Sequence, residues 1–118
     1  MSEKTDSDFL IHIAEAAGRA SSYTEEMTCE NFLEDTKTQD AVIRNIEIIG
    51  EAVKNLSDEI RNKYPEIPWK ELAGMRDRLI HQYFGVNLDI VWNVAKDELP
   101  EILLRIKEIQ TIAEKNGG

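Results

Sequence analysis

Apolar side chains recur at helical spacing along most of the 118-residue chain. The clearest run forms one continuous seam, with spacings of four, three, four and three residues, which is typical of a buried helix face. Its members are Val42, Ile46, Ile49, Val53 and Leu56. Gly50 lies inside this helix, where it costs about 1 kcal/mol relative to alanine. We therefore expect another backbone to approach the helix closely at Gly50.

Similar stripes predict the other helices. A first helix is expected to be capped by Asp6 or Ser7 and broken by residues 21–24. Shorter helices follow the capping residues Thr28, Ser57 and Asn87. Another helix is predicted from Trp69 to about Tyr83, ended by Gly85.

The last periodic stretch contains Pro100, which should kink the helix or start a new one after Asp97 or Glu98. An alternating strand pattern is absent from the sequence. The fold class predicted is therefore all-α: an up-down helical bundle of four main helices plus short helices.

Length and composition fit one domain over residues 1–118, with residues 1–6 and 115–118 expected to be flexible ends. No apolar run approaches the roughly 20 residues of a membrane span, and the first residues do not resemble a signal peptide. The single cysteine, Cys29, excludes an internal disulfide and a thiolate zinc cluster. These features predict a cytoplasmic protein without membrane contact, in which Cys29 is a small buried side chain.

The charge balance argues, at first, against a nucleic-acid partner. Fourteen Lys and Arg residues stand against twenty-three Asp and Glu residues, a formal net charge of −9. Nucleic-acid binders usually carry a positive field, because phosphate contacts dominate their affinity.

One short segment, residues 74–85, concentrates chemically active side chains at a predicted helix end. They are Arg76, Asp77, His81 and Tyr83. On an ideal helix Asp77 and His81 share a face, so the carboxylate could fix the tautomer of the imidazole. Arg76 and His81 would point about 140° apart. Three solutions remain: the last turn unwinds toward Gly85, the arginine reaches round, or a second protomer completes the site.

The segment from Pro68 to Trp92, with Arg-x-x-x-x-His-x-Tyr at residues 76, 81 and 83, closely resembles the HepT toxins of the HEPN superfamily. The helix at residues 43–52 is also similar, and the resemblance extends over roughly residues 7–115. It implies a HEPN-like homodimer in which the Arg and His motifs of two subunits line a shared cleft. It further implies a metal-independent endoribonuclease, the toxin of a toxin–antitoxin pair. Its antitoxin would be a minimal nucleotidyltransferase that consumes ATP, so this chain needs no cofactor.

Residue roles follow from the matching motif positions. The resemblance implies that His81 is the acid–base residue and that Arg76 binds phosphate. It also implies that Tyr83 receives AMP from the antitoxin, while Asp77 occupies a variable, supporting position. The chemistry is reasonable: histidine titrates near neutrality, and a guanidinium offers a planar fork to phosphoryl oxygens. An attached AMP would repel the RNA backbone.

Simpler interpretations exist for each residue. Arg76 and Asp77 could belong to a solvated helix face, His81 could be a cation at a helix C-terminus, and Tyr83 could be a core aromatic. A further set has mainly structural expectations. Arg78 should form an ion pair or extend a positive patch, and His12 should lie at the edge of the first helix. Trp69 and Trp92 should be packing residues. Glu47 and Glu51 should face either the cleft or solvent. No metal site is expected, because Asp77 and His81 have no evident third ligand.

Two other functions are compatible with the sequence. The chain could be a non-catalytic helical homodimer that serves as the regulatory or binding subunit of a nucleotidyltransferase. It could also bind a free nucleotide through Arg76.

The local charge of the motif modifies the first conclusion about RNA. Between residues 69 and 85, three cations (Lys70, Arg76 and Arg78) stand against Glu71 and Asp77, a local charge of +1. In a two-fold dimer each cleft would collect two such segments, giving a positive slot in an acidic body. Net charge therefore restricts where RNA could bind without excluding it.

Overall fold

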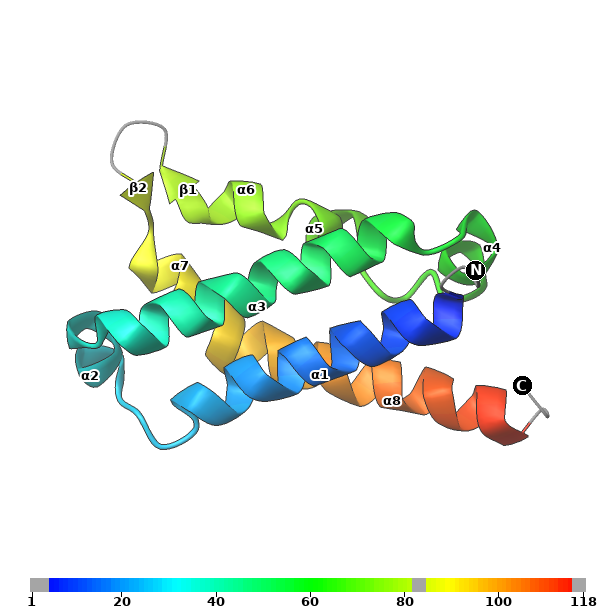
Figure 1. Cartoon of the computed structure of the whole chain (residues 1–118), viewed down its shortest axis with the longest axis horizontal. Helices are drawn as coiled ribbons and strands as arrows, with labels where there is room; N and C mark the ends of the chain where they lie inside the picture. The colour runs from blue at the N-terminus through cyan, green and yellow to red at the C-terminus, as the bar shows by residue number, and fades with distance from the viewer. Residues whose placement is uncertain (1–4, 82–84, 116–118) are drawn as a thin grey trace, which may run out of the picture.

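Three long helices, α1, α3 and α8, lie side by side along the longest axis of the molecule (Figure 1). The structure, a computed structural model, describes residues 5–81 and 85–115, with Ile80 and His81 described by their backbone alone. The elements in chain order are α1 (Asp6–Thr24), α2 (Cys29–Glu34), α3 (Thr36–Asn55), α4 (Asp58–Lys63), α5 (Trp69–Ala73), α6 (Met75–Leu79), β1 (Ile80–His81), β2 (Gly85–Val86), α7 (Leu88–Asn93), the π-helical turn η1 (Val94–Glu98) and α8 (Leu99–Lys115).

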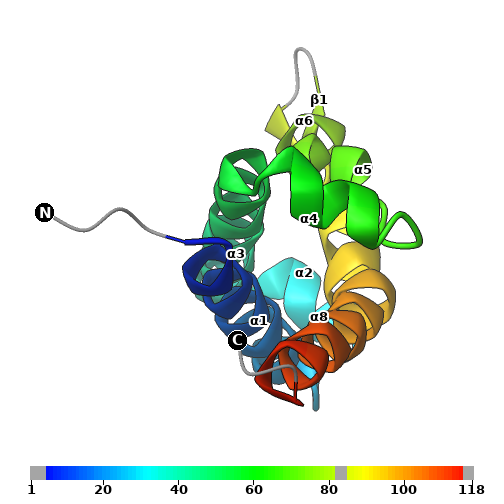
Figure 2. The same cartoon turned by 90° about the vertical axis from the view of Figure 1, so that its right-hand side faces the viewer.

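The core lies where the apolar faces of these helices meet. Helix α1 packs against α3 on one side and α8 on the other, and α3 also contacts α5 and α6. Viewed along the bundle, the short elements α4 and α5 lie across from α1 and close the ring of helices (Figure 2). Fully buried side chains such as Ile13, Ile46 and Ile106 come from all three long helices. The all-α prediction is confirmed, but the predicted helix from Trp69 to Tyr83 is not one helix.

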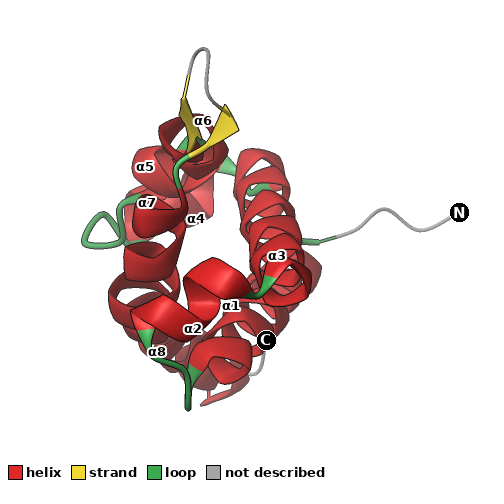
Figure 3. Cartoon of the chain, turned by 90° about the vertical axis from the view of Figure 1, so that its left-hand side faces the viewer, coloured by secondary structure: helices red, strands yellow, loops and turns green. Residues whose placement is uncertain are grey.

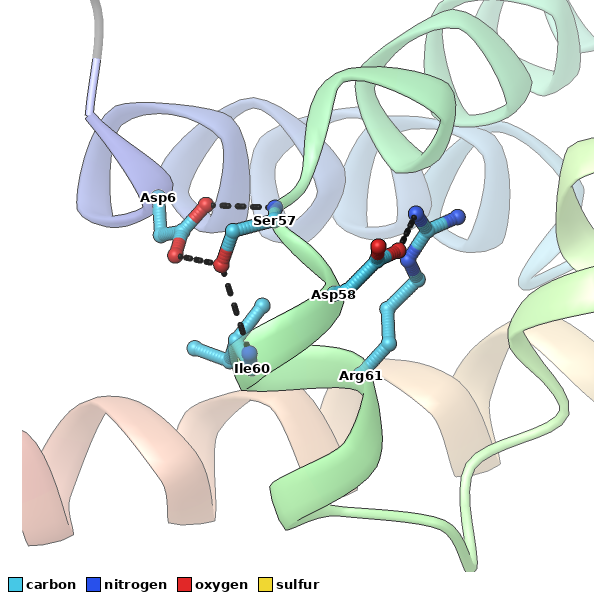
Figure 4. Close-up of polar contacts among 5 residues, drawn as sticks. All are labelled: Asp6, Ser57, Asp58, Ile60 and Arg61. Carbon is cyan, nitrogen blue, oxygen red and sulfur yellow. Dashed lines mark hydrogen bonds and ion pairs between the residues drawn. The ribbon is translucent and has the colours of Figure 1, made fainter.

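The start of α1 differs from the prediction in its cap. Thr5, rather than Asp6 or Ser7, caps the helix: the Asp8 N–H donates to Thr5 Oγ1, and the Thr5 N–H donates to Asp8 Oδ2. Asp6 instead accepts two hydrogen bonds from Ser57, from its N–H at 2.9 Å and from its Oγ at 2.6 Å (Figure 4). Helix α1 begins at Asp6 and α8 ends at Lys115, and the flexibility expected of the chain ends stays a prediction. Residues 1–4 and 116–118 lie outside the described residues.

The end of α1 also differs, because the serine-rich stretch does not break the helix. It continues to Thr24, where hydroxyl groups bond back to carbonyls of the preceding turn. Ser22 Oγ donates to the Arg19 carbonyl at 3.0 Å, and Thr24 Oγ1 donates to the Ala20 carbonyl at 3.2 Å. These bonds satisfy the polar side chains inside the helix.

The expected caps of the short helices are confirmed. Thr28, Ser57 and Asn87 each accept a hydrogen bond from a backbone N–H of the helix that follows. Figure 4 shows the Ser57 cap and the neighbouring ion pair between Asp58 and Arg61, 2.7 Å apart.

The close approach predicted at Gly50 is also confirmed. A Cβ atom at Gly50 would lie 3.3 Å from the Ala73 carbonyl oxygen and 3.5 Å from that of Leu72. The C-terminal turn of α5 therefore rests directly on the backbone of α3.

Helix α8 begins directly after Glu98, which is one of the two outcomes expected at Pro100, and the backbone before it stays helical through η1. The chain passes from α7 through the π-helical turn η1, and α8 begins at Leu99, so Pro100 occupies its first turn, where no N–H is needed. Within η1, Lys96 Nζ donates to the carbonyls of Thr24 and Glu25 at 3.0 and 3.3 Å. This lysine thereby caps the C-terminus of α1.

Three further expectations concern single side chains. Trp69 is buried and donates from its indole N–H to the Tyr64 carbonyl, and Trp92 packs against Phe32, so both are packing residues as predicted. Cys29 is half-buried rather than buried, because it is the first residue of α2. Among the described residues, no helix combines the length and apolar character needed to cross a membrane.

Candidate functional site

The motif segment leaves the helical conformation earlier than predicted. Helix α5 ends at Ala73, α6 ends at Leu79, and the chain then forms a two-residue antiparallel pair, β1 with β2 (Figure 3). Ile80 pairs with Val86, and His81 pairs with Gly85. This pair is absent from the sequence prediction, because two residues are too short for an alternating pattern.

Backbone geometry explains why the helix stops. Gly85 has φ +78°, a conformation that side-chain-bearing residues rarely adopt, and it lies in β2 instead of ending a helix. The Asn87 N–H, directly after β2, donates to the Leu79 carbonyl at 2.6 Å. This bond satisfies a carbonyl group at the C-terminus of α6. The shared helix face expected for Asp77 and His81 required a continuous helix, and that helix ends at Leu79, before His81. Of the three solutions, unwinding toward Gly85 matches the backbone.

The side chains of two predicted site residues, His81 and Tyr83, are not described by the structure. His81 is placed as a backbone position in β1, next to the end of α6. Tyr83 lies outside the described residues. The roles expected of these two side chains stay predictions.

Arg76 lies on the exposed side of α6 and contacts α3. Its Nε donates to Glu47 Oε2 at 2.8 Å, with the arginine side chain 57% and the glutamate 33% exposed. The terminal guanidinium nitrogens make no hydrogen bond to any described residue. Glu47 therefore orients the guanidinium from one side and leaves its other donors for a ligand. Glu47 was expected to face either the cleft or solvent, and the structure places its carboxylate in direct contact with Arg76 of the candidate site.

A groove of about 620 Å³ opens beside this ion pair. Arg76 and Glu47 form part of its wall, together with residues of α1 and of the outer face of α3. His12, which was expected at the edge of the first helix, lies half-buried on α1 and lines the same groove. Arg44 also lines it.

Neither His12 nor Arg44 was assigned to the site from the sequence. Arg44, Glu47 and Glu51 follow a helical spacing on α3, and this charged face was the available signal for Arg44. His12 is 64 positions before Arg76 in the chain, so only the packing of α1 on α3 brings them together.

Asp77 and Arg78 point to other contacts. Asp77 is exposed and makes no hydrogen bond within the described part of the chain, so its supporting role stays a prediction. Arg78 forms a forked ion pair with Glu98 of η1, at 3.0 and 3.1 Å. Hydrogen bonding to the Glu98 carboxylate raises the pKa of Arg78. Arg78 thus has the structural ion pair that was one of its two expected roles.

Residues 5–79 and 85–115 contain no cluster of side chains that could form a metal centre. No group of three His, Cys, Asp or Glu side chains there is close enough together to hold an ion. What the candidate site does offer is an oriented guanidinium beside a mixed-charge groove, which suits a phosphate group.

Comparison with known proteins identifies the family. Residues 13–109 match the family model described as Ribonuclease HepT-like. A provisionally named RNase of Methanocaldococcus jannaschii is 47% identical over 109 residues, covering 92% of this chain and 90% of the relative. The probable ribonuclease HepT of Thermococcus cleftensis is 44% identical over 108 residues, covering 92% and 98%.

A provisionally named RNase of Caldanaerobacter subterraneus subsp. tengcongensis is 45% identical over 106 residues, covering 90% and 95%. No solved structure matches the chain significantly. With a family model over most of its length and several relatives above 40% identity, this chain belongs to the HepT-like ribonuclease family.

Proposed function

We propose that this protein is a metal-independent endoribonuclease in which Arg76 binds the scissile phosphate and His81 transfers protons. The observation that carries the proposal is the contact between Arg76 and Glu47. One guanidinium nitrogen is held at 2.8 Å from a carboxylate of α3, while the terminal nitrogens keep their donors beside a groove. Membership in a ribonuclease family gives the substrate class.

The reaction needs no metal-bound water, because RNA carries its own nucleophile. The 2′-hydroxyl attacks the adjacent phosphorus and loses its proton to a general base, while the 5′-oxygen leaves and takes up a proton. The products are a 2′,3′-cyclic phosphate and a 5′-hydroxyl. His81 can act as base or as acid in this step, because an imidazole titrates near neutrality. Arg76 stabilises the charge that develops on the phosphoryl oxygens.

The same proposal includes a homodimer and a partner. Two motif segments from two protomers would supply two copies of Arg76 and His81 to one cleft. The protein would act as a toxin, neutralised by a minimal nucleotidyltransferase that transfers AMP from ATP onto Tyr83. The added phosphate would repel the RNA backbone next to the phosphate-binding arginine.

Cleavage of RNA by the purified protein, in the presence of EDTA, tests the proposal directly. We expect Arg76→Ala and His81→Ala each to lower kcat/KM by about a hundredfold or more. Lys107→Ala removes one exposed cation from α8 and serves as the matched control, with activity like the wild type. Equal cleavage by all four proteins, or cleavage that EDTA abolishes, would exclude this mechanism.

Modification is tested by the intact mass of the protein after co-expression with a minimal nucleotidyltransferase. AMP-sized mass additions that disappear in Tyr83→Phe would support Tyr83 as the acceptor. A stable complex without mass addition, and without ribonuclease activity of the free protein, would instead favour a non-catalytic regulatory subunit.

A further inference from the structure

The groove beside Arg76 continues along α3 well beyond the motif. On α3 its lining extends from Arg44 to Asn55, and on α1 it includes Phe9 and His12. At 1.5 Å per residue, this length of α3 corresponds to about 16 Å. We refer to this surface as the α1–α3 groove. It is far longer than one phosphate requires, so the contact of Arg76 with a single phosphate leaves most of it unexplained.

The cations of the groove are available to a ligand. Arg44 and Lys54 are both exposed, and neither forms an ion pair or hydrogen bond with any described residue. Glu47 is already paired with Arg76. Glu51 is therefore the one groove carboxylate without an ion pair among the described residues. Three cations against two carboxylates give the groove a local charge of +1, in a chain whose net charge is −9.

An aromatic pair lies at the α1 wall of the same groove. The rings of Phe9 and His12 meet edge to face, with centroids 6.2 Å apart and an interplanar angle of 87°. Phe9 packs against the core and so holds the position of His12, which is half-buried. Binding sites for single-stranded nucleic acid commonly combine aromatic rings with cations, because unpaired bases stack on the rings while the cations contact phosphates.

We propose that the α1–α3 groove binds the single-stranded RNA that flanks the scissile phosphate. Arg44 and Lys54 contact backbone phosphates, and the His12 ring stacks on an unpaired base. This inference rests on the proposed function, because it extends the RNA path from Arg76. At a stacked rise of about 3.4 Å, the groove accommodates roughly four or five nucleotides. The ring contact requires an unpaired base, so single strands are preferred over duplex RNA.

Binding of a fluorescein-labelled, mixed-sequence 2′-O-methyl oligoribonucleotide tests the groove without cleavage. We expect Arg44→Gln to raise Kd about fivefold and to reduce the salt dependence of binding by about one phosphate contact. Glu51→Gln, which removes a repelling charge, should lower Kd about threefold. Lys107→Gln, the same charge loss on α8, should leave Kd unchanged.

The histidine ring has its own pair of variants. His12→Ala should raise Kd about fivefold or more, and His12→Phe, which keeps a ring for stacking, should restore wild-type affinity. Duplex RNA of the same sequence should not distinguish His12→Ala from the wild type. Arg44, Glu51 and Lys107 are exposed and His12 is half-buried, and unfolding curves will show whether each variant is folded.

The outcomes separate this inference from the proposed function. If Arg76 and His81 are required for cleavage but the groove variants bind RNA like Lys107→Gln, the groove inference is wrong and the function stands. If the groove variants shift RNA affinity as expected but no RNA is cleaved, the proposed function fails and the binding site stands. If the groove variants change sedimentation of the protein instead of RNA affinity, the groove is a protein–protein interface and the inference is overturned.

Discussion

The long helices and the motif segment both bury apolar side chains, but the motif segment is made of much shorter elements and adds specific contacts to that packing. Helices α1, α3 and α8 bury apolar side chains along their whole length. The segment from α5 to β2 consists of two five-residue helices and a two-residue strand pair, and it exposes Arg76, Asp77 and Arg78. Its other face is packed into the core through Trp69, Leu72, Met75 and Leu79. Three further contacts join it to Gly50 and Glu47 on α3 and to Glu98 on η1. Substitutions of these three contacts should therefore be separable from substitutions of buried side chains that unfold the protein.

The largest expected effect is in the long helices. Ile46→Ala removes a fully buried side chain from α3 and should lower the free energy of unfolding by about 3 kcal/mol, because a cavity remains. Urea denaturation measures this change. The control, Leu104→Ala, removes a side chain that is 58% exposed on α8, and its cost should stay below about 1 kcal/mol. Similar costs for both would show that burial does not dominate this region.

The next effect lies where the two regions touch. Gly50→Ala gains helix propensity, but its Cβ would press on the Ala73 carbonyl at 3.3 Å, so we expect a net loss of about 1 kcal/mol. Gly18 in α1 is the matched control. A Cβ there would meet only Leu103 Cδ2, at an ordinary 3.9 Å, so Gly18→Ala should raise stability by about 0.5–1 kcal/mol. Thermal unfolding of both variants gives the comparison; a stabilising Gly50→Ala would mean that α5 moves away without cost.

A smaller effect concerns the attachment to η1. A double-mutant cycle with Arg78→Ala and Glu98→Gln should give a coupling of about 0.5–1 kcal/mol, the upper range for an exposed pair, because the contact is forked. The raised pKa of Arg78 means that its contribution is lost only as pH rises through that raised value. The coupling should thus be unchanged between neutral and moderately alkaline pH. The pair of Arg105 with Glu101, a single contact at 3.2 Å, should give a weaker coupling and is the reference.

The smallest expected effect is at the start of α3 and depends on pH. Asp35 caps α3 by accepting hydrogen bonds from the N–H and the hydroxyl of Thr38, and these bonds lower the pKa of Asp35 below 3.8. A lowered pKa stabilises the fold above the ordinary value, and the contribution is lost as pH falls through the lowered one. Asp35→Ala should therefore lower Tm at neutral pH, with the difference shrinking in acid. Asp40→Ala, which removes an exposed charge from the same helix, should show a smaller, less pH-dependent difference.

Local patterns account for the elements that the sequence predicted correctly. The apolar seam of α3 and the caps Thr28, Ser57 and Asn87 depend on residues within a few positions of one another. The close backbone approach at Gly50 could be predicted because a glycine inside a long helix is unfavourable, which indicates that close packing requires it.

The motif segment could not be predicted in the same way, because distant residues decide its conformation. Its apolar residues follow helical spacing as far as Tyr83. However, the Asn87 N–H donates a hydrogen bond to the Leu79 carbonyl, and the Arg76 side chain donates one to Glu47. The α1–α3 groove has the same origin. His12 and Arg44 belong to different helices, and only tertiary packing makes them neighbours.

The attachment of the motif segment to α3 has a mechanical consequence. Gly50 and Glu47 are three residues apart, so the backbone contact and the ion pair lie less than one helical turn apart, about 4.5 Å along the axis. Together with the buried side chains Leu72, Met75 and Leu79, these two contacts fix both the height and the rotation of the segment on the helix. The orientation of Arg76 therefore depends on a short stretch of α3 as well as on the buried residues Met75 and Leu79 of its own five-residue helix. If residues 69–86 were transplanted into another helical protein, Arg76 would keep its orientation only where the receiving helix offered a glycine and a glutamate at this spacing, beside an apolar surface for the buried side chains of the segment.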